Sequence, residues 1–194
     1  MNTQTIVLTK GANIDLTKTH PGLDKIACEL SWDVNPGAGS AYDLDGSAAI
    51  LTANGKLVGN DKLNFVYFGN KKSPNGAVYS SGDNLTGAGD GADETIFIEL
   101  SKLPADCEQI DVFVNIYQAK QRNQNFGQVP KAGIVVKDVR DGTVLAKYDL
   151  QDNYATETSV MVGSVYRKDG EWKFRAVGAG HQKEIGEFFQ AYAA

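Results

Sequence analysis

The sequence contains few of the residues that build thiolate or imidazole metal sites: its 194 residues include two cysteines and two histidines. Cys28 and Cys107 lie far apart and form no C-x-x-C pair, so no zinc site of that kind can be read. We expect both to be reduced thiols in the core. His20 and His181 are equally isolated, and no G-x-S-x-G motif accompanies them. From this shortage of catalytic groups we expect that the protein is not an enzyme.

Long runs of one charge or of apolar residues are also missing. The net charge is −5, and no lysine- or arginine-rich stretch suits a phosphate backbone, so we expect no nucleic-acid partner. No basic segment followed by an apolar run marks a signal peptide, and no stretch of about 18 apolar residues occurs. We therefore expect a cytoplasmic protein, where free thiols are normal.

What the sequence does have is glycine, with 21 residues, and many short apolar runs separated by turn residues. This pattern predicts a mostly β protein, an antiparallel β-sandwich, as one domain over residues 1–194. One stretch, Lys183 to Ala191, has apolar residues at helical spacing and predicts a C-terminal helix. The strands that we expect are 6–8, 14–16, 26–32, 42–51, 63–68, 95–100, 110–117, 132–139, 144–150, 160–167 and 172–177.

The most informative segment is an acidic, glycine-rich run from Gly82 to Glu94. It lies in a longer stretch, Ser73 to Ser101, that contains no lysine or arginine. Calcium takes six to eight oxygen ligands from carboxylates, amides and backbone carbonyls, and glycines allow a loop to turn its carbonyls inward. The run therefore predicts a calcium site, whose candidate residues here are Asp83, Asn84, Gly87, Gly89, Asp90, Gly91, Asp93 and Glu94.

A second acidic pair, Asp43 and Asp45, lies in a predicted strand. Residues two apart share a face of a strand, so both carboxylates should point the same way as Ser47, opposite the apolar Leu44 and Ile50. Two such carboxylates repel each other unless a cation lies between them. We therefore assign both to the same calcium region.

Other interpretations of the acidic run are less consistent with its charge. A G-x-G-x-x-A pattern begins at Gly87, but no helix follows it, and several carboxylates would repel a pyrophosphate. The spacing also differs from that of an EF-hand loop. A solvated turn without an ion remains the structural alternative.

The same run resembles the signature loop of the TerD family of tellurite-resistance and stress proteins. The resemblance continues in order along nearly the whole chain, at Trp32-Asp33, Tyr42-Asp43-Leu44-Asp45, Ser73 to Val78, Gln124 to Gln128, Tyr148-Asp149-Leu150, Glu157-Thr158, Tyr166-Arg167 and Gly170 to Gly178. It implies a β-sandwich that binds Ca²⁺ at the acidic loop, without enzymatic activity. It also implies a role in stress or phage resistance, with other Ter-type proteins as partners, in complexes that can be membrane-linked.

This sequence departs from the family pattern at Ala88 and Ala92, where family loops often carry acids. Because ligand charge tunes calcium affinity, the departures predict weaker binding or fewer ions. The segment Gln124 to Val129 is either a structured turn or a partner surface. Two alternative functions stay open: a calcium-dependent membrane-docking module similar to a C2 domain, and a metal-dependent hydrolase.

Overall fold

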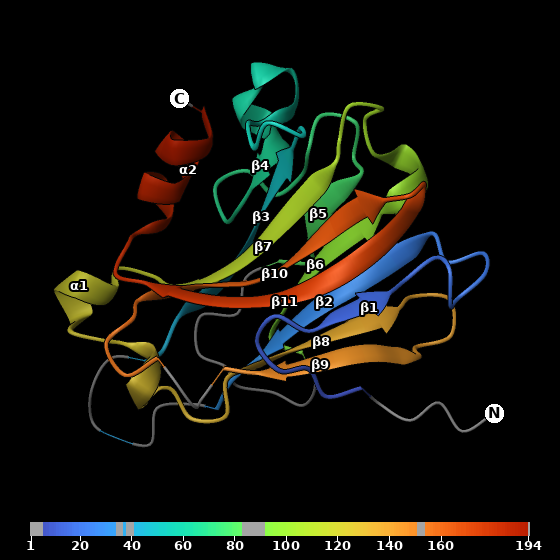
Figure 1. The fold of residues 1–194 in the computed structure, drawn as a ribbon. Helices are drawn as coiled ribbons and strands as arrows, with labels where there is room; N and C mark the ends of the chain where they lie inside the picture. Colours follow the sequence, from blue (N-terminus) through green and yellow to red (C-terminus); the bar gives the residue numbers. More distant parts are fainter. Residues whose placement is uncertain (1–5, 34–36, 38–40, 83–91, 151–153, 194) are drawn as a thin grey trace.

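The computed structural model describes residues 6–33, 37, 41–82, 92–150 and 154–193, which form two antiparallel sheets (Figure 1). Within this part of the chain, one sheet has six strands and the other has five. The six-stranded sheet has the order β1 (Asn13–Asp15), β11 (Glu171–His181), β10 (Ser159–Lys168), β7 (Gln109–Ile116), β3 (Leu44–Leu51) and β4 (Phe65–Val66). The five-stranded sheet has the order β5 (Val78–Ser80), β6 (Glu94–Glu99), β2 (Lys25–Ser31), β8 (Gly133–Asp138) and β9 (Val144–Asp149). The predicted sandwich is confirmed.

The main core lies between the two sheets and is built by alternate residues of each strand. In β3, Leu44, Ala48 and Ile50 pack into this core. Ala49 and Leu51 belong instead to a second apolar cluster. This alternation follows from the two-residue period of a strand, and it gives β3 one apolar face and one face that can carry other chemistry.

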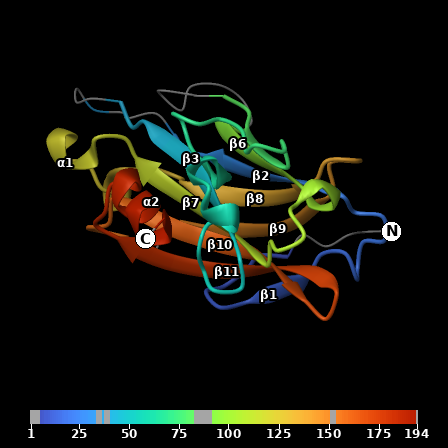
Figure 2. The ribbon, with the colours of Figure 1, turned by 90° about the horizontal axis from the view of Figure 1, so that it is seen from above.

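The second cluster lies under α2 (Ile185–Ala193), the predicted C-terminal helix, which begins and ends two residues later than expected. Phe188 of α2 packs with its ring centroid 4.9 Å from that of Phe113 in β7. Tyr192 donates a 2.8 Å hydrogen bond to the carboxylate of Asp111, which is buried in the same strand. The helix therefore covers the outer face of the six-stranded sheet, on the same side of the molecule as the one-turn helix α1 (Ala119–Arg122) (Figure 2).

Two expected strands are shorter in the structure, and one strand of the structure is not among those expected. The predicted strand at 6–8 is an isolated parallel bridge between Val7 and Lys147. The predicted strand at 63–68 shortens to β4, because residues Lys62–Asn64 form a 3-10 turn capped by the side chain of Asp61. The short strand β5 was not expected, because its three residues are too few to show a period of two. Further 3-10 turns are Val58–Asn60, Leu100–Lys102 and Phe126–Gln128.

The N-terminal segment joins the edges of the two sheets. Leu8 donates its backbone N–H to the carbonyl of Lys147 in β9 at 2.8 Å. A few residues later, Gly11 donates to the carbonyl of Ala176 in β11 at 2.8 Å, and Ala176 donates back to Ala12 at 2.9 Å. One segment, with a turn at residues 10–11, thus binds an edge strand of the five-stranded sheet and then the six-stranded sheet.

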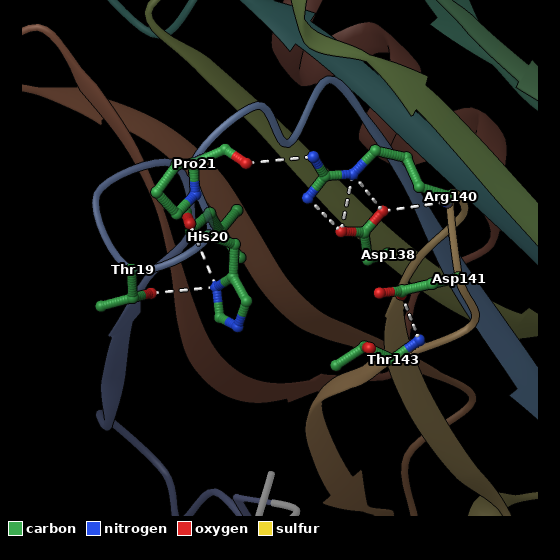
Figure 3. A network of polar contacts seen from close by, with 8 residues as sticks. Thr19, His20, Pro21, Asp138, Arg140, Asp141 and Thr143 are labelled. Carbon is green, nitrogen blue, oxygen red and sulfur yellow. Dashed lines mark hydrogen bonds and ion pairs between the residues drawn. The ribbon is translucent and has the colours of Figure 1, made fainter. Parts of the chain in front are cut away.

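A dense polar network fixes the turn between β8 and β9 (Figure 3). The guanidinium and backbone N–H of Arg140 donate four hydrogen bonds of 2.6 to 3.1 Å to the buried carboxylate of Asp138. The guanidinium also donates to the carbonyl of Pro21 at 3.0 Å, which ties in the turn before β2. These bonds hold the pKa of Asp138 below its usual range.

Candidate metal centre

The predicted calcium residues fall into two sets in the structure. Four of them, Asp43, Asp45, Asp93 and Glu94, are described. The other six lie outside the described residues: Asp83, Asn84, Gly87, Gly89, Asp90 and Gly91. The four described residues lie on β3 and β6 or immediately before these strands.

Asp93 and Glu94 stand at the start of β6 and bind two other strands at the same end of the sandwich. The carboxylate of Glu94 crosses between the sheets and accepts the backbone N–H of Gly46 in β3 at 2.7 Å. The carboxylate of Asp93 accepts the backbone N–H of Trp32, just after β2, at 2.9 Å. The residues on which the acidic run ends thus fix the ends of β2, β3 and β6 to one another.

The Leu30 side chain leaves little room for a Cβ atom at Gly46, the residue that donates to Glu94. A Cβ atom at Gly46 would lie 2.8 Å from Cδ1 of Leu30 and 3.5 Å from the carboxylate oxygen of Glu94. The first distance is closer than van der Waals contact allows. A larger residue at position 46 would therefore require the Leu30 side chain to shift.

Asp45 lies on the face of β3 that points away from the main core, as the alternation predicts, and Asp43 comes just before the strand. Asp45 pairs in register with Asn115 of β7, whose side-chain amide donates to its carboxylate at 3.3 Å. The guanidinium of Arg122 lies 3.4 Å from the carboxylate of Asp43. Both acids are buried, with exposed fractions of 6% and 3%, so their charges are poorly screened by water.

Two oxygen atoms beside these acids indicate that the site suits a hard cation. The hydroxyl of Ser47 and the amide oxygen of Asn115 are buried and have no hydrogen-bond partner in the structure. Leaving a buried polar atom unpaired costs about 1–3 kcal/mol, and such atoms often mark the place of a water molecule or an ion. Carboxylate, amide and hydroxyl oxygens are all calcium ligands.

The ligand set is incomplete in the part of the chain that the structure describes. Among those residues, no three His, Cys, Asp or Glu side chains come together as a metal-holding group. Calcium needs six to eight oxygens, so the described acids can supply only part of a site. The rest of the predicted set lies in residues 83–91.

The electrostatics around Asp93 favour a nearby cation. Burial raises the pKa of Asp93, the charge of Asp33 raises it further, and the hydrogen bond from Trp32 opposes both. Asp33, which also lies at this end, forms an ion pair of 2.9 Å with Lys131. A cation beside Asp93 would stabilise its ionised form.

These acids occur on a chain whose family can be assigned. A model of the TerD domain matches residues 4–192. The chain belongs to the TerD family. Similar proteins include general stress protein 16U of Bacillus subtilis (strain 168), 43% identical over 180 residues and covering 92% of each chain. Tellurium resistance protein TerD of Alcaligenes sp is 43% identical over 176 residues, covering 91% of each chain.

A solved structure has the same fold. A homologue of telluride resistance protein (TerD), SCO6318 from Streptomyces coelicolor A3(2), superposes with a TM-score of 0.70 and 25% identity. The match covers 89% of this chain and 99% of that one. The family resemblance read from the residues is confirmed, and the chain is a member of a family of tellurium resistance and stress-response proteins.

Sequence reasoning missed two residues of this TerD-family site. Asn115 carries a signal, because it is a lone amide in the apolar run of β7. Arg122 carries none, since a basic residue 79 positions from Asp43 in sequence looks like any surface charge. The nearby segment Gln124 to Val129 is a structured turn, with Phe126 and Val129 both buried.

The two cysteines of this TerD-family chain are far from reactive. Cys28 and Cys107 are both free and buried. Burial raises the pKa of each thiol to about 12. A raised thiol pKa and burial both disfavour the thiolate near neutral pH.

Proposed function

We propose that this TerD-family chain is a calcium-binding stress-response protein that acts as a binding or scaffold component. The observation that carries the proposal is the pair of unmatched buried oxygens, on Ser47 and Asn115, next to the buried carboxylates of Asp43 and Asp45. A buried cluster of this charge and composition is stabilised by a hard divalent cation. The resemblance of the acidic run to the family's calcium loop supports the same conclusion.

In this proposal the described residues form one wall of the site. Asp45 and Asn115 present oxygens from the outer face of β3 and β7, and Asp43 presents its own from just before β3, while Asp93 and Glu94 hold the end of the acidic run against β2 and β3. Bound calcium would neutralise the clustered carboxylates. In this proposal Asp83, Asn84, Asp90 and the glycines 87, 89 and 91 of the acidic run complete the ligand set.

The proposed partners are other Ter-type proteins, in the cytoplasm, and the protein is proposed to have no catalytic role of its own. Within the part of the chain that the structure describes, no helix is long and apolar enough to cross a membrane.

Calorimetric titration of chelator-stripped protein with calcium tests the proposal. We expect saturable binding to the wild type, a much weaker response to magnesium, and affinity at least about tenfold lower in Asp45→Asn, because ligand charge sets calcium affinity. Asp141→Asn is the matched control, since it removes one charge from an exposed turn of the five-stranded sheet. Absence of heat at millimolar calcium would contradict the proposal.

A thermal shift gives a second readout. A ligand at about 100 times its dissociation constant stabilises the folded state by about 2.7 kcal/mol. For a chain of this size that corresponds to a rise in melting temperature of about 5–10 °C. Wild type and Asp141→Asn should show the rise, and Asp45→Asn should show little of it at the same calcium concentration.

Two alternative functions can be tested with the same protein. Sedimentation with anionic liposomes, with and without calcium, tests a membrane-docking module similar to a C2 domain. A screen of phosphoester and glycoside substrates with the metal present tests a metal-dependent hydrolase, and only turnover that disappears in Asp45→Asn would support it.

A further inference from the structure

The short helix α1 buries Ala119 in the main core and makes two ion pairs that point in different directions. Arg122 places its guanidinium 3.4 Å from the carboxylate of Asp43. Lys120, on the same turn, places its ammonium 3.5 Å from the carboxylate of Glu187 in α2. A single helical turn therefore connects a proposed calcium ligand to the C-terminal helix.

The residues at both ends of α1 adopt an unusual backbone conformation. Gln118 has a φ of 52° and Asn123 a φ of 51°, in the left-handed region that residues other than glycine rarely adopt. Such joints persist only where the surrounding contacts hold them. The turn is thus a separate element, and its position depends on those contacts.

Arg122 makes a second contact that reports on its position. Its guanidinium lies over the ring of Tyr117, 5.2 Å from the ring centroid. The ring of Tyr117 meets that of Phe68 edge-on at 5.5 Å, and Phe68 is 39% exposed. Movement of Arg122 would therefore change the environment of an aromatic pair at the surface.

The charges explain why Arg122 lies where it does. The side chain of Asp43 is only 8% exposed, whereas that of Arg122 is 25% exposed. A buried carboxylate needs a counter-charge, and the guanidinium supplies one. A divalent cation bound by the same carboxylate would repel the guanidinium, because both carry positive charge at short range in a poorly screened place.

We propose that Arg122 is the built-in counter-ion of Asp43 and that calcium displaces it, so that ion binding releases α1 from β3. This inference rests on the proposed calcium site and adds its regulation. Arg122 keeps the ion-free protein stable and lowers its calcium affinity. Displacement of Arg122 changes how α1 is held between Asp43 and Glu187, so a partner that contacts α1, Tyr117 or α2 can sense whether the ion is present.

Calcium titration of Arg122→Gln, Lys120→Gln and Arg122→Lys tests the competition. Removing a positive charge beside a divalent ion should tighten calcium binding in Arg122→Gln by about tenfold. Lys120→Gln removes the same charge from the same helical turn, but at the ion pair with Glu187, and should stay within about twofold of the wild type. Arg122→Lys keeps the charge and should also stay close to the wild type. The melting temperature of Arg122→Gln without calcium should fall below that of the wild type.

Nuclear magnetic resonance of the arginine side chains tests the displacement in the unmodified protein. The chain has only four arginines, at positions 122, 140, 167 and 175, so Arg122→Gln identifies the Nε–H signal of Arg122 directly. We expect this signal to shift with calcium at the same midpoint as the calorimetric binding. Arg140, held by Asp138, should barely move and serves as the internal reference.

The outcomes separate the two proposals. If the wild type binds calcium but Arg122→Gln and Lys120→Gln have equal affinities, or the Arg122 signal does not move, the counter-ion role is wrong and the calcium site stands. If calcium binds Arg122→Gln but not the wild type, calcium does not displace Arg122 in the natural chain, and both the calcium-binding function and the displacement are wrong. If calcium binds neither, both proposals are overturned.

Discussion

Two buried acidic clusters lie at opposite ends of β2, and they are built very differently. Asp138 pairs in register with Ile26 near the start of β2, and Glu94 pairs with Leu30 near its end. At the first end, Arg140 gives Asp138 four hydrogen bonds between 2.6 and 3.1 Å. At the second end, the contacts to Asp43 and Asp45 from Arg122 and Asn115 are 3.4 and 3.3 Å long.

This difference separates an acidic residue with a structural role from a candidate metal ligand. The carboxylate of Asp138 accepts hydrogen bonds from Arg140, two residues away (Figure 3). Arg140 also donates to Pro21, so the pair connects two turns and has a structural role. Beside Asp43 and Asp45, the hydroxyl of Ser47 and the amide oxygen of Asn115 are buried without a hydrogen-bond partner. Burial alone does not mark a site, because Asp138 is as buried as Asp45. Buried oxygens without a hydrogen-bond partner, such as those of Ser47 and Asn115, are a better mark of a candidate site.

The largest effect should come from breaking the saturated cluster with Asp138→Asn. Hydrogen bonds to a charged group contribute about 1.5–3 kcal/mol, so we expect a loss of about 2 kcal/mol in the free energy of unfolding. Chemical denaturation at pH 7 measures it. Asp141→Asn, in the same turn but exposed, should cost clearly less, and an equal loss in both variants would contradict the comparison.

The same variant sharpens the comparison through pH. The pKa of Asp138 in the folded protein is lowered by Arg140, whereas an unfolded aspartate titrates near about 3.9. A group with a lowered folded pKa adds stability above the unfolded value and loses it as pH falls toward the folded value. The gap in melting temperature between wild type and Asp138→Asn should thus be constant from about pH 5 to 7 and shrink below about pH 4.

A smaller effect, with opposite signs in two serines, should follow from Ser47→Ala and Ser164→Ala. Ser164 donates a 2.6 Å hydrogen bond to buried Asp111, whose pKa is raised by burial, so its removal should cost about 1–2 kcal/mol. The hydroxyl of Ser47 has no partner, so its removal should leave the calcium-free protein unchanged or slightly more stable. With calcium, Ser47→Ala should show a smaller rise in melting temperature than the wild type. A loss in Ser47→Ala equal to that in Ser164→Ala, without calcium, would show that Ser47 is structural.

For the two cysteines we expect no effect on calcium affinity. Cys28 and Cys107 are fully buried, with thiol pKa values of about 12. A thiol reagent should therefore label the native protein only at the rate of unfolding, and the Cys28→Ala, Cys107→Ala double variant should keep the calcium affinity of the wild type. Rapid labelling of the native protein would contradict this prediction and show that the core thiols are accessible.

Most of the fold could be predicted from the sequence, because the strands show a period of two wherever they are long enough. β3 is an example: Leu44, Ala48 and Ile50 face the core, and Asp45 faces away, as alternation requires. β5 and the shortened β4 could not be predicted, since two or three residues carry no period. Tertiary contacts decide such short elements.

The site could be predicted only in part, for a related reason. Asp43, Asp45, Asp93 and Glu94 are clustered in sequence, and the structure brings their strands to one end of the sandwich. Arg122 reaches Asp43 from 79 positions away through a one-turn helix with left-handed ends, a geometry that no sequence spacing encodes. Asn115 depends on the register between β3 and β7, which only the folded sheet defines.

The segment before β1 also covers strand edges that could otherwise pair with another chain. Unpaired strand edges are templates for strands from a neighbouring molecule. Leu8 pairs with Lys147 in the edge strand β9, and the turn from Gly11 to Ala12 pairs with Ala176 where β1 leaves β11 uncovered. A shortened chain that begins at Asn13 would expose backbone donors and acceptors on both sheets. We expect such a chain to self-associate by strand pairing at either exposed edge.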